Sequence, residues 1–203
     1  MDTPDFNFER AAMLNGHSRV CGIDEAGRGP WAGPVVAAAV ILDPDRIPHG
    51  LNDSKKLNEA QREALFDPIM QSAQVAVGIA EAERIDRDNI LAATLWAMGE
   101  AVRSLTIVPS LALVDGNQAP ALSCPVQTIV SGDARCMSIA AASIIAKVTR
   151  DRLMARLDGA YPSYGFARHK GYGTAAHRDA LLRHGPCPQH RRSFAPIAQF
   201  MAR

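Results

Sequence analysis

Short apolar segments rich in β-branched residues alternate in this chain with longer segments of helical periodicity, and this alternation restricts the fold most strongly. The predicted strands span 19–23, 35–42, 73–80, 111–114 and 126–130. The predicted helices span 58–70, 84–105, 136–157 and 175–184. Asn58, with Gln61 three residues later, is typical of a capped helix start. Strands that alternate with helices predict an α/β layer fold.

The length and composition are those of one globular domain. The chain has 203 residues, of which 47% are hydrophobic and 21% charged, enough to bury a sizeable core. Because no repeat or linker interrupts it, we expect a single domain over 1–203, with a loosely attached C-terminal extension from about 185 to 203. The four cysteines form no CxxC pair, so we expect buried thiols rather than zinc ligands or disulfides.

Neither a membrane span nor a signal peptide is evident in the sequence. The longest apolar stretch, Pro30–Leu42, is shorter than the roughly 20 residues that cross a bilayer. The first ten residues lack the basic start and apolar core of a secretory signal. We therefore expect a cytoplasmic protein without a membrane partner.

Charge is distributed unevenly, although the net charge is only +1. Residues 1–134 carry a charge of −8 and residues 135–203 a charge of +9. If folding keeps these halves apart, one gathers cations and the other meets phosphates. A random imbalance that folding mixes together is the alternative interpretation.

Acidic residues follow three of the predicted strands. Asp24 and Glu25 come after 19–23, Asp115 comes directly after 111–114, and Asp133 lies just beyond 126–130. Ligands of α/β sheets gather outside strand ends, so these carboxylates are candidates for one site. For each acid alone, a role in a turn is the alternative. Together they would repel one another unless a cation compensates them, and oxygen ligands favour Mg²⁺ or Mn²⁺ over zinc.

A glycine-rich turn follows the first two acids directly. In the segment AGRGP, the glycines let the backbone approach a ligand closely, and the Arg28 guanidinium can bind a phosphate. The GxxxxGK[ST] pattern of a phosphate loop is absent. Further blocks lie along the chain: DSKKL, LVDGN, GDARCMSIAAASIIAKVTRD, YGFARHKGYGT and HRRSF. In order and spacing these blocks closely resemble the bacterial ribonuclease HII family, from about Val20 to Pro196.

The resemblance implies a ribonuclease H-like fold, with a mixed five-stranded sheet, helices on both sides and a helical C-terminal part. It also implies that the four acids named above bind Mn²⁺ or Mg²⁺ and are catalytic. By the same resemblance, the turn formed by Gly27, Arg28 and Gly29 reads the 2′-hydroxyl at the junction of ribonucleotide and deoxyribonucleotide. Tyr172 is implied to contact that junction and to pack on the next deoxyribose; a packing tyrosine is the alternative.

Several basic residues are candidates for phosphate contacts, which would make affinity depend on salt. Lys55 and Lys170 are the first candidates because they are loop residues in matched motifs, followed by Lys56, Lys147 and His169. A solvated surface charge is the alternative for each.

Four other polar residues are expected to be structural. We interpret Asp151 as a structural acid that pairs with an arginine. His177, His184 and His190 are expected to be packing or helix-end residues rather than metal ligands.

The expected function is that of a metal-dependent endoribonuclease. By resemblance, it hydrolyses the phosphodiester 5′ to ribonucleotides in RNA–DNA hybrids and at single ribonucleotides in duplex DNA. The products carry a 3′-hydroxyl and a 5′-phosphate, and the cellular role is removal of ribonucleotides from DNA. A monomer is the default state, and docking on a replication clamp is left open by the sequence.

Three alternatives remain to be distinguished. A transposase- or resolvase-like nuclease of the same fold has no need of a 2′-hydroxyl reader beside the first acid. An inactive hybrid-binding module would not need all four acids. A ribonuclease HIII carries an additional N-terminal domain, for which we expect no room before the first predicted strand.

Overall fold

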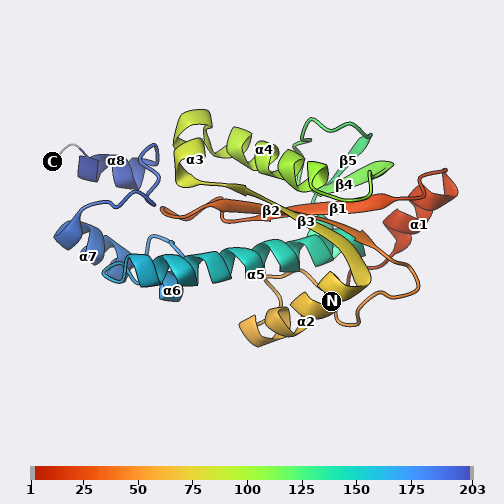
Figure 1. Cartoon of the computed structure of the whole chain (residues 1–203), viewed down its shortest axis with the longest axis horizontal. Helices are drawn as coiled ribbons and strands as arrows, with labels where there is room; N and C mark the ends of the chain where they lie inside the picture. Colours follow the sequence, from red (N-terminus) through yellow and green to blue (C-terminus); the bar gives the residue numbers. More distant parts are fainter. Residues whose placement is uncertain (1–2, 202–203) are drawn as a thin grey trace.

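A mixed five-stranded sheet lies between two layers of helices in the computed structural model, which describes residues 3–201 (Figure 1). The strands are β1 (Val20–Ala26), β2 (Val35–Leu42), β3 (Ala73–Ala80), β4 (Leu111–Asp115) and β5 (Val126–Ile129). Their order in the sheet is β3-β2-β1-β4-β5. β1 runs antiparallel to β2 and parallel to β4, and β4 runs parallel to β5. The predicted α/β fold with a mixed five-stranded sheet is confirmed.

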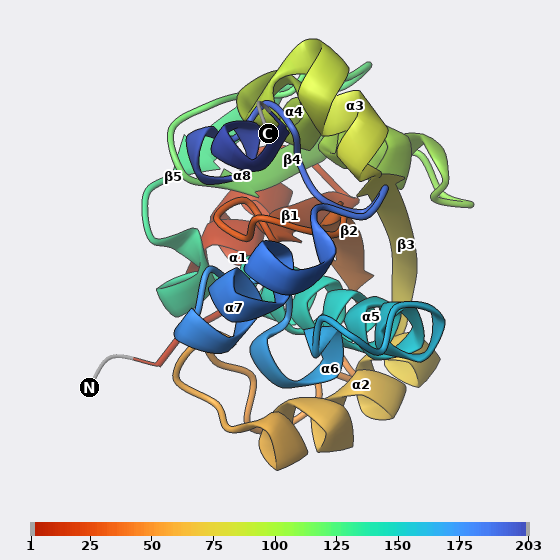
Figure 2. The same ribbon diagram turned by 90° about the vertical axis from the view of Figure 1, so that its left-hand side faces the viewer.

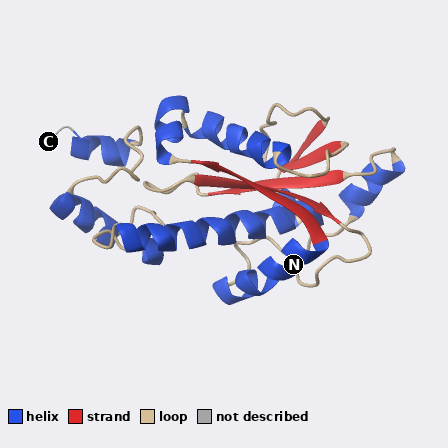
Figure 3. Ribbon diagram, viewed as in Figure 1, coloured by secondary structure: helices blue, strands red, loops and turns tan. Residues whose placement is uncertain are grey.

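Helices cover both faces of the sheet and extend past one of its ends (Figures 2 and 3). α3 (Ala82–Asp88) and α4 (Ile90–Arg103) lie on one face, and α2 (Glu59–Ser72) and α5 (Met137–Ala160) on the other. The remaining helical elements are α1 (Asn7–Leu14), the short η1 (Gly132–Ala134), α6 (Phe166–His169), α7 (Ala175–His184) and α8 (Ala195–Met201). Of the helices in the described part of the chain, none is long and apolar enough to cross a membrane.

The inner strand β2 is buried on both faces, which explains its continuous run of apolar residues. Val35 and Ala37 pack in the cluster that α4 covers, and Ala38 and Val40 pack in the cluster that α5 covers. The sheet is therefore the middle layer of a three-layer core.

The extent of β1 and the continuity of the helix predicted over 84–105 differ from the sequence-based expectation. β1 continues to Ala26 because it pairs with β2 up to the partners Ala26 and Val36, so Asp24 and Glu25 lie within the strand. The single helix predicted over 84–105 is two helices separated at Asn89, whose φ is +70°. The Asn89 carboxamide oxygen accepts hydrogen bonds from the amides of Leu91 and Ala92 and thereby caps α4. The cap on α2 formed by Asn58 and Gln61 is confirmed.

The chain after Gly185 is docked rather than loose, in contrast to the expectation. Arg191 and Ile197 are fully buried, and the amide of Arg191 donates to the carbonyl of Trp31. Asp86 of α3 accepts hydrogen bonds from the amides of Arg192 and Ser193. These contacts bind the C-terminal segment to the turn after β1 and to α3.

The approach of α5 to β1 requires a residue without a side chain at position 22. A Cβ atom on Gly22 would lie 2.1 Å from the backbone carbon of Ser138 in α5. We predict that Gly22→Ala lowers the free energy of unfolding by about 3 kcal/mol, the upper part of the range for overpacked cores. Chemical denaturation measures this change.

Gly159 in α5 supplies the control, because nothing lies within 4 Å of a Cβ built on it. Gly159→Ala should raise the free energy of unfolding by about 0.5–1 kcal/mol through helix propensity. Equal destabilisation by both substitutions would contradict the proposed packing of α5 on β1.

Candidate active site

The register between β1 and β4 places two carboxylates next to each other. Ile23 pairs with Val114 in a parallel ladder, so the next residues along the two strands, Asp24 and Asp115, are neighbours. Asp115 ends β4, and Asp24 is only 4% exposed because it lies inside the longer strand β1. Neighbours in register project on the same face of a sheet, which brings both side chains to one point.

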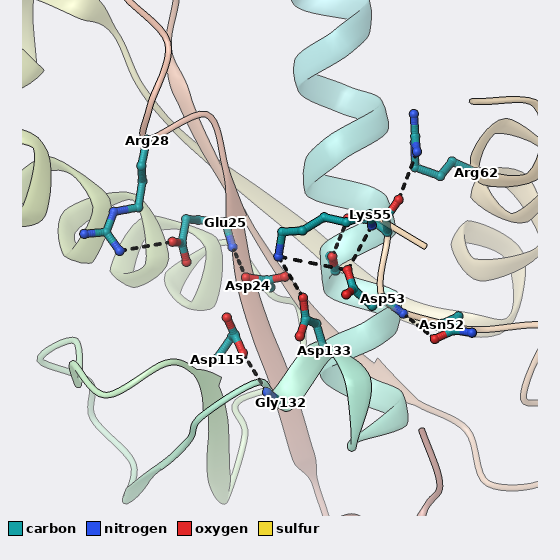
Figure 4. Close-up of polar contacts among 12 residues, drawn as sticks. Asp24, Glu25, Arg28, Asn52, Asp53, Lys55, Arg62, Asp115, Gly132 and Asp133 are labelled. Carbon is teal, nitrogen blue, oxygen red and sulfur yellow. Dashed lines mark hydrogen bonds and ion pairs between the residues drawn. The ribbon is translucent and has the colours of Figure 1, made fainter. Parts of the chain in front are cut away.

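A third carboxylate comes from the short helical turn that links β5 to α5. Asp133 lies in η1, where the amide of Gly132 donates to Oδ1 of Asp115 at 2.7 Å. Asp24, Asp115 and Asp133 each offer one carboxylate oxygen, and these oxygens lie within 4.8 Å of one another (Figure 4). We call these three residues the acidic triad.

Glu25 lies beside the acidic triad but not within it. Successive residues of a strand alternate between faces, and Glu25 pairs with Ala37 of the α4-facing cluster while Asp24 pairs with Ala38 of the α5-facing cluster. Oε1 of Glu25 is 3.5 Å from Nη1 of Arg28, which leaves its carboxylate at the rim of the site (Figure 4).

Burial and mutual repulsion disfavour negative charge at these carboxylates. Burial is the main cause that raises the pKa of Asp24 well above its usual value, and the charges of Glu25, Asp115 and Asp133 raise it further. Burial and the charge of Asp133 raise the pKa of Asp115. Burial likewise raises the pKa of Glu25, against the opposing effect of Arg28. When ionised, these carboxylates therefore repel one another, and a bound cation would compensate their negative charge.

The ammonium of Lys55 partly compensates this negative charge. Its Nζ is 3.0 Å from Oδ2 of Asp133 and 4.0 Å from Oδ1 of Asp53. Burial alone would lower the pKa of Lys55, but the hydrogen bond and charge of Asp133 outweigh it and raise the pKa. Lys55 thus comes to the acids from the loop before α2, as Figure 4 shows.

One pocket of about 250 Å³ joins the acids to the glycine-rich turn. Its walls include Asp24, Glu25, Asp115 and Lys55 together with the turn residues 27–29 and Tyr172. Tyr172 is 49% exposed, and its ring edge would lie 3.7 Å from a Cβ on Gly29. Three of the four sequence-predicted acids therefore border the same space as the turn and the tyrosine, whereas Asp133 does not line it.

Three of the five candidates for phosphate contacts, Lys56, His169 and Lys170, do not line this pocket. Lys170 does not line this pocket, and its Nζ is 4.0 Å from a carboxylate oxygen of Glu59. The expectation for His169 is wrong, because this residue is buried and both ring nitrogens bind backbone groups. Its imidazole stacks on that of His177, with ring centroids 4.4 Å apart.

The residues expected to be structural are structural, with one change of partner. Asp151 pairs with Lys147 at 2.7 Å rather than with an arginine, because the two lie one turn apart on α5. His177 and His190 are buried and hydrogen-bonded to each other, and His184 is exposed at the end of α7.

Sequence reasoning did not assign Ser54, Ser143 and Arg150 to the pocket they line. Ser143 donates to Ser54 at 2.7 Å, and both are buried. Ser143 belongs to the small-residue run at the start of α5, and Ser54 belongs to the DSKKL block. Membership in these sequence blocks could have indicated that both residues line the pocket, whereas the spacing of single residues could not.

The acidic triad suits a hard divalent cation. Its donors are carboxylate oxygens, no histidine or cysteine of the described chain is among them, and Asp24 is both buried and repelled by its neighbours. Such donor sets favour Mg²⁺ or Mn²⁺.

We predict that Asp24→Asn stabilises the metal-free protein at pH 7 while removing one candidate metal ligand. A pKa raised in the folded state means that the folded chain binds more protons, so ionisation of Asp24 lowers stability as pH rises above its ordinary value of 3.8. Asparagine removes this penalty and retains the Oδ1 acceptor for the amide of Glu25. Each kcal/mol gained raises Tm by about 2–4 °C in a chain of this size.

Thermal melts in EDTA between pH 4 and pH 8 measure this effect, and the gain should shrink towards pH 4. The control is Asp45→Asn, at an exposed acid outside the site, which should not show the gain. A lower Tm for Asp24→Asn at pH 7 would show that the buried carboxylate stabilises the fold.

A family model and a curated relative identify the family of this chain. The chain matches the family model for ribonuclease HII over residues 21–197. It is 59% identical to a ribonuclease HII of Xanthobacter autotrophicus over 195 residues, which cover 96% of this chain and 78% of the relative.

Solved structures share the fold. Ribonuclease H2 from Pyrococcus horikoshii superposes with a TM-score of 0.76 at 28% identity and covers 91% of this chain and 97% of its own. Bst-RNase HIII, solved in complex with Mn²⁺, superposes with a TM-score of 0.66 at 21% identity, covering 95% of this chain and 72% of its own. The fold is therefore the ribonuclease H-like fold, and the chain belongs to the ribonuclease HII family, whose members are endonucleases that hydrolyse RNA in RNA–DNA hybrids.

Proposed function

We propose that this ribonuclease HII cleaves the phosphodiester 5′ to a ribonucleotide, in RNA–DNA hybrids and at single ribonucleotides embedded in duplex DNA. The products would carry a 3′-hydroxyl and a 5′-phosphate, and the cellular role would be removal of ribonucleotides from DNA. The observation that supports this proposal best is the shared pocket, because it joins a carboxylate cluster to a turn and a tyrosine that fit a sugar.

The carboxylates are proposed to hold Mn²⁺ or Mg²⁺. Bound divalent ions supply an activated water and stabilise the departing oxygen of a phosphodiester. Asp24, Asp115 and Asp133 would be ligands because their oxygens already lie within 4.8 Å of one another. Glu25 would join them from the rim, where Arg28 now pairs with it.

The turn and Tyr172 are proposed to select the sugar. The 2′-hydroxyl distinguishes a ribonucleotide from a deoxyribonucleotide, so a selective nuclease needs groups that contact it. Gly27, Arg28 and Gly29 offer main-chain groups at the wall of the pocket, and Tyr172 lies across from Gly29. A deoxyribose would leave the main-chain groups unpaired, which costs binding free energy.

Loss of one acid should abolish cleavage without loss of the fold. We expect Asp115→Asn to lower kcat by orders of magnitude in Mg²⁺ or Mn²⁺, because one of three close carboxylates loses its charge. A gel compares an RNA–DNA hybrid, a duplex with one ribonucleotide and an all-DNA duplex, with and without the ion. Far-ultraviolet circular dichroism checks the fold of the variant.

Two outcomes would contradict the proposal. Full activity of Asp115→Asn would exclude this residue as a ligand. Equal cleavage of the all-DNA and ribonucleotide-containing duplexes by the unmodified enzyme would exclude sugar selection and would favour a DNA nuclease of the same fold.

Lys55 is proposed to contact a substrate phosphate, because its ammonium lies at the pocket that holds the acids. Lys55→Ala should weaken substrate binding and reduce the salt dependence of log K by about one unit of slope. Lys56→Ala is the matched control, since Lys56 is an exposed neighbour that does not line the pocket. Lys170 does not line the pocket and is proposed only for a phosphate outside it, so Lys170→Ala should weaken binding less than Lys55→Ala. Equal effects at positions 55 and 56 would contradict the assignment.

A further inference from the structure

A fully buried arginine from the C-terminal segment lies behind the glycine-rich turn. Arg191 is 0% exposed, and its guanidinium donates only to backbone carbonyls of the chain that follows β1. The acceptors are the carbonyls of Gly27 (2.6 Å), Arg28 (2.9 Å), Pro30 (2.7 Å) and Gly33 (3.0 and 2.8 Å). A single side chain thus binds four peptide groups of one turn.

This arrangement is not an ion pair. Among the salt bridges of residues 3–201, none includes Arg191. Burial lowers the pKa of Arg191 to about 9, so the group remains protonated at neutral pH. A buried cation without a carboxylate partner costs free energy of folding unless its donors are satisfied. Here the carbonyls of the turn satisfy them.

The orientation of these carbonyls determines where the turn's amides point. In a trans peptide the C=O of one residue and the N–H of the next point in opposite directions. Because the carbonyls of Gly27 and Arg28 face Arg191, the N–H groups of Arg28 and Gly29 face the other way. Arg28 and Gly29 line the pocket, Arg191 does not, and no hydrogen bond within 3–201 is donated by either amide.

The residue before Arg191, His190, is linked to Tyr172 by hydrogen bonds that pass through His177. Nδ1 of His190 accepts from the amide of Cys187 at 3.0 Å, and Nε2 of His190 is hydrogen-bonded to Nε2 of His177 at 2.9 Å. Nδ1 of His177 then donates to the carbonyl of Tyr172 at 2.9 Å. His190 and Arg191 therefore support Tyr172 and the glycine-rich turn, the two parts of the pocket that are proposed to contact the sugar.

We propose that Arg191 is a positioning residue for ribose selection: by binding the carbonyls of Gly27 and Arg28, it directs the N–H groups of Arg28 and Gly29 to the place of the 2′-hydroxyl. The inference rests on the proposed function, since it assumes that the turn contacts the sugar. It adds that selectivity for ribose depends on a side chain that never touches the substrate.

The test is Arg191→Lys, which keeps the positive charge but loses the planar fork that reaches several carbonyls at once. Binding of a duplex with one ribonucleotide and of the matching all-DNA duplex is measured by fluorescence anisotropy, with Asp115→Asn in both proteins to prevent turnover. We expect the preference for the ribonucleotide to fall by about tenfold, with affinity for all-DNA duplex unchanged. In the otherwise unmodified enzyme, kcat/KM on the single-ribonucleotide duplex should fall by up to about 10²-fold, as for other displaced groups.

The matched control is Leu181→Ala, which removes a buried apolar side chain from the same C-terminal cluster but none of the hydrogen bonds from Arg191 to the turn. It should lower Tm but keep the ribonucleotide preference, so a change of preference cannot be a consequence of lower stability. If Arg191→Lys keeps the preference of the parent protein, the inference is overturned. If the parent protein itself has no preference, the proposed function fails instead.

Discussion

The parallel pairing of β1 with β4 is the constraint on which the site depends. With Ile23 opposite Val114, the backbone holds Asp24 and Asp115 side by side whether or not their charges are compensated. The free-energy cost of the repulsion between these carboxylates is offset by the packing of the core on both faces of β2 and by the contact of α5 with Gly22. Because folding already holds these carboxylates in place, binding of a cation does not have to order them and loses less conformational entropy.

The three acids of the acidic triad have different supports, although Asp24 and Asp133 are equally buried, each 4% exposed. Asp24 lies in the middle of a sheet, Asp115 at a strand end, and Asp133 on a turn fixed by the amide of Gly132 against Asp115. Lys55 approaches from a loop on the open side. Two of the acids therefore come from the sheet, and Lys55, which is proposed to meet the substrate, comes from a loop.

Much of the fold and the positions of the acids were predictable, because apolar runs, caps and acids at strand ends are local signals. The extension of β1 to Ala26 and the separation of Asp24 from Glu25 onto opposite faces depend on pairing with β2, which no local pattern encodes. The break at Asn89 was missed because apolar spacing continues across it, whereas the positive φ and the cap interrupt the helix. His169 was misassigned because a basic loop composition does not reveal burial.

Arg191 illustrates the limit of such reasoning most clearly. In the HRRSF block two arginines are adjacent; Arg191 is fully buried, whereas the side chain of Arg192 is exposed. The two arginines differ because the guanidinium of Arg191 donates to carbonyls of a turn about 160 positions earlier in the sequence. Only the folded chain brings these groups together. Because the same turn borders the acids, the C-terminal segment is part of the construction of the site. Under the proposed function, substrate selection and folding of the chain end are coupled through one guanidinium.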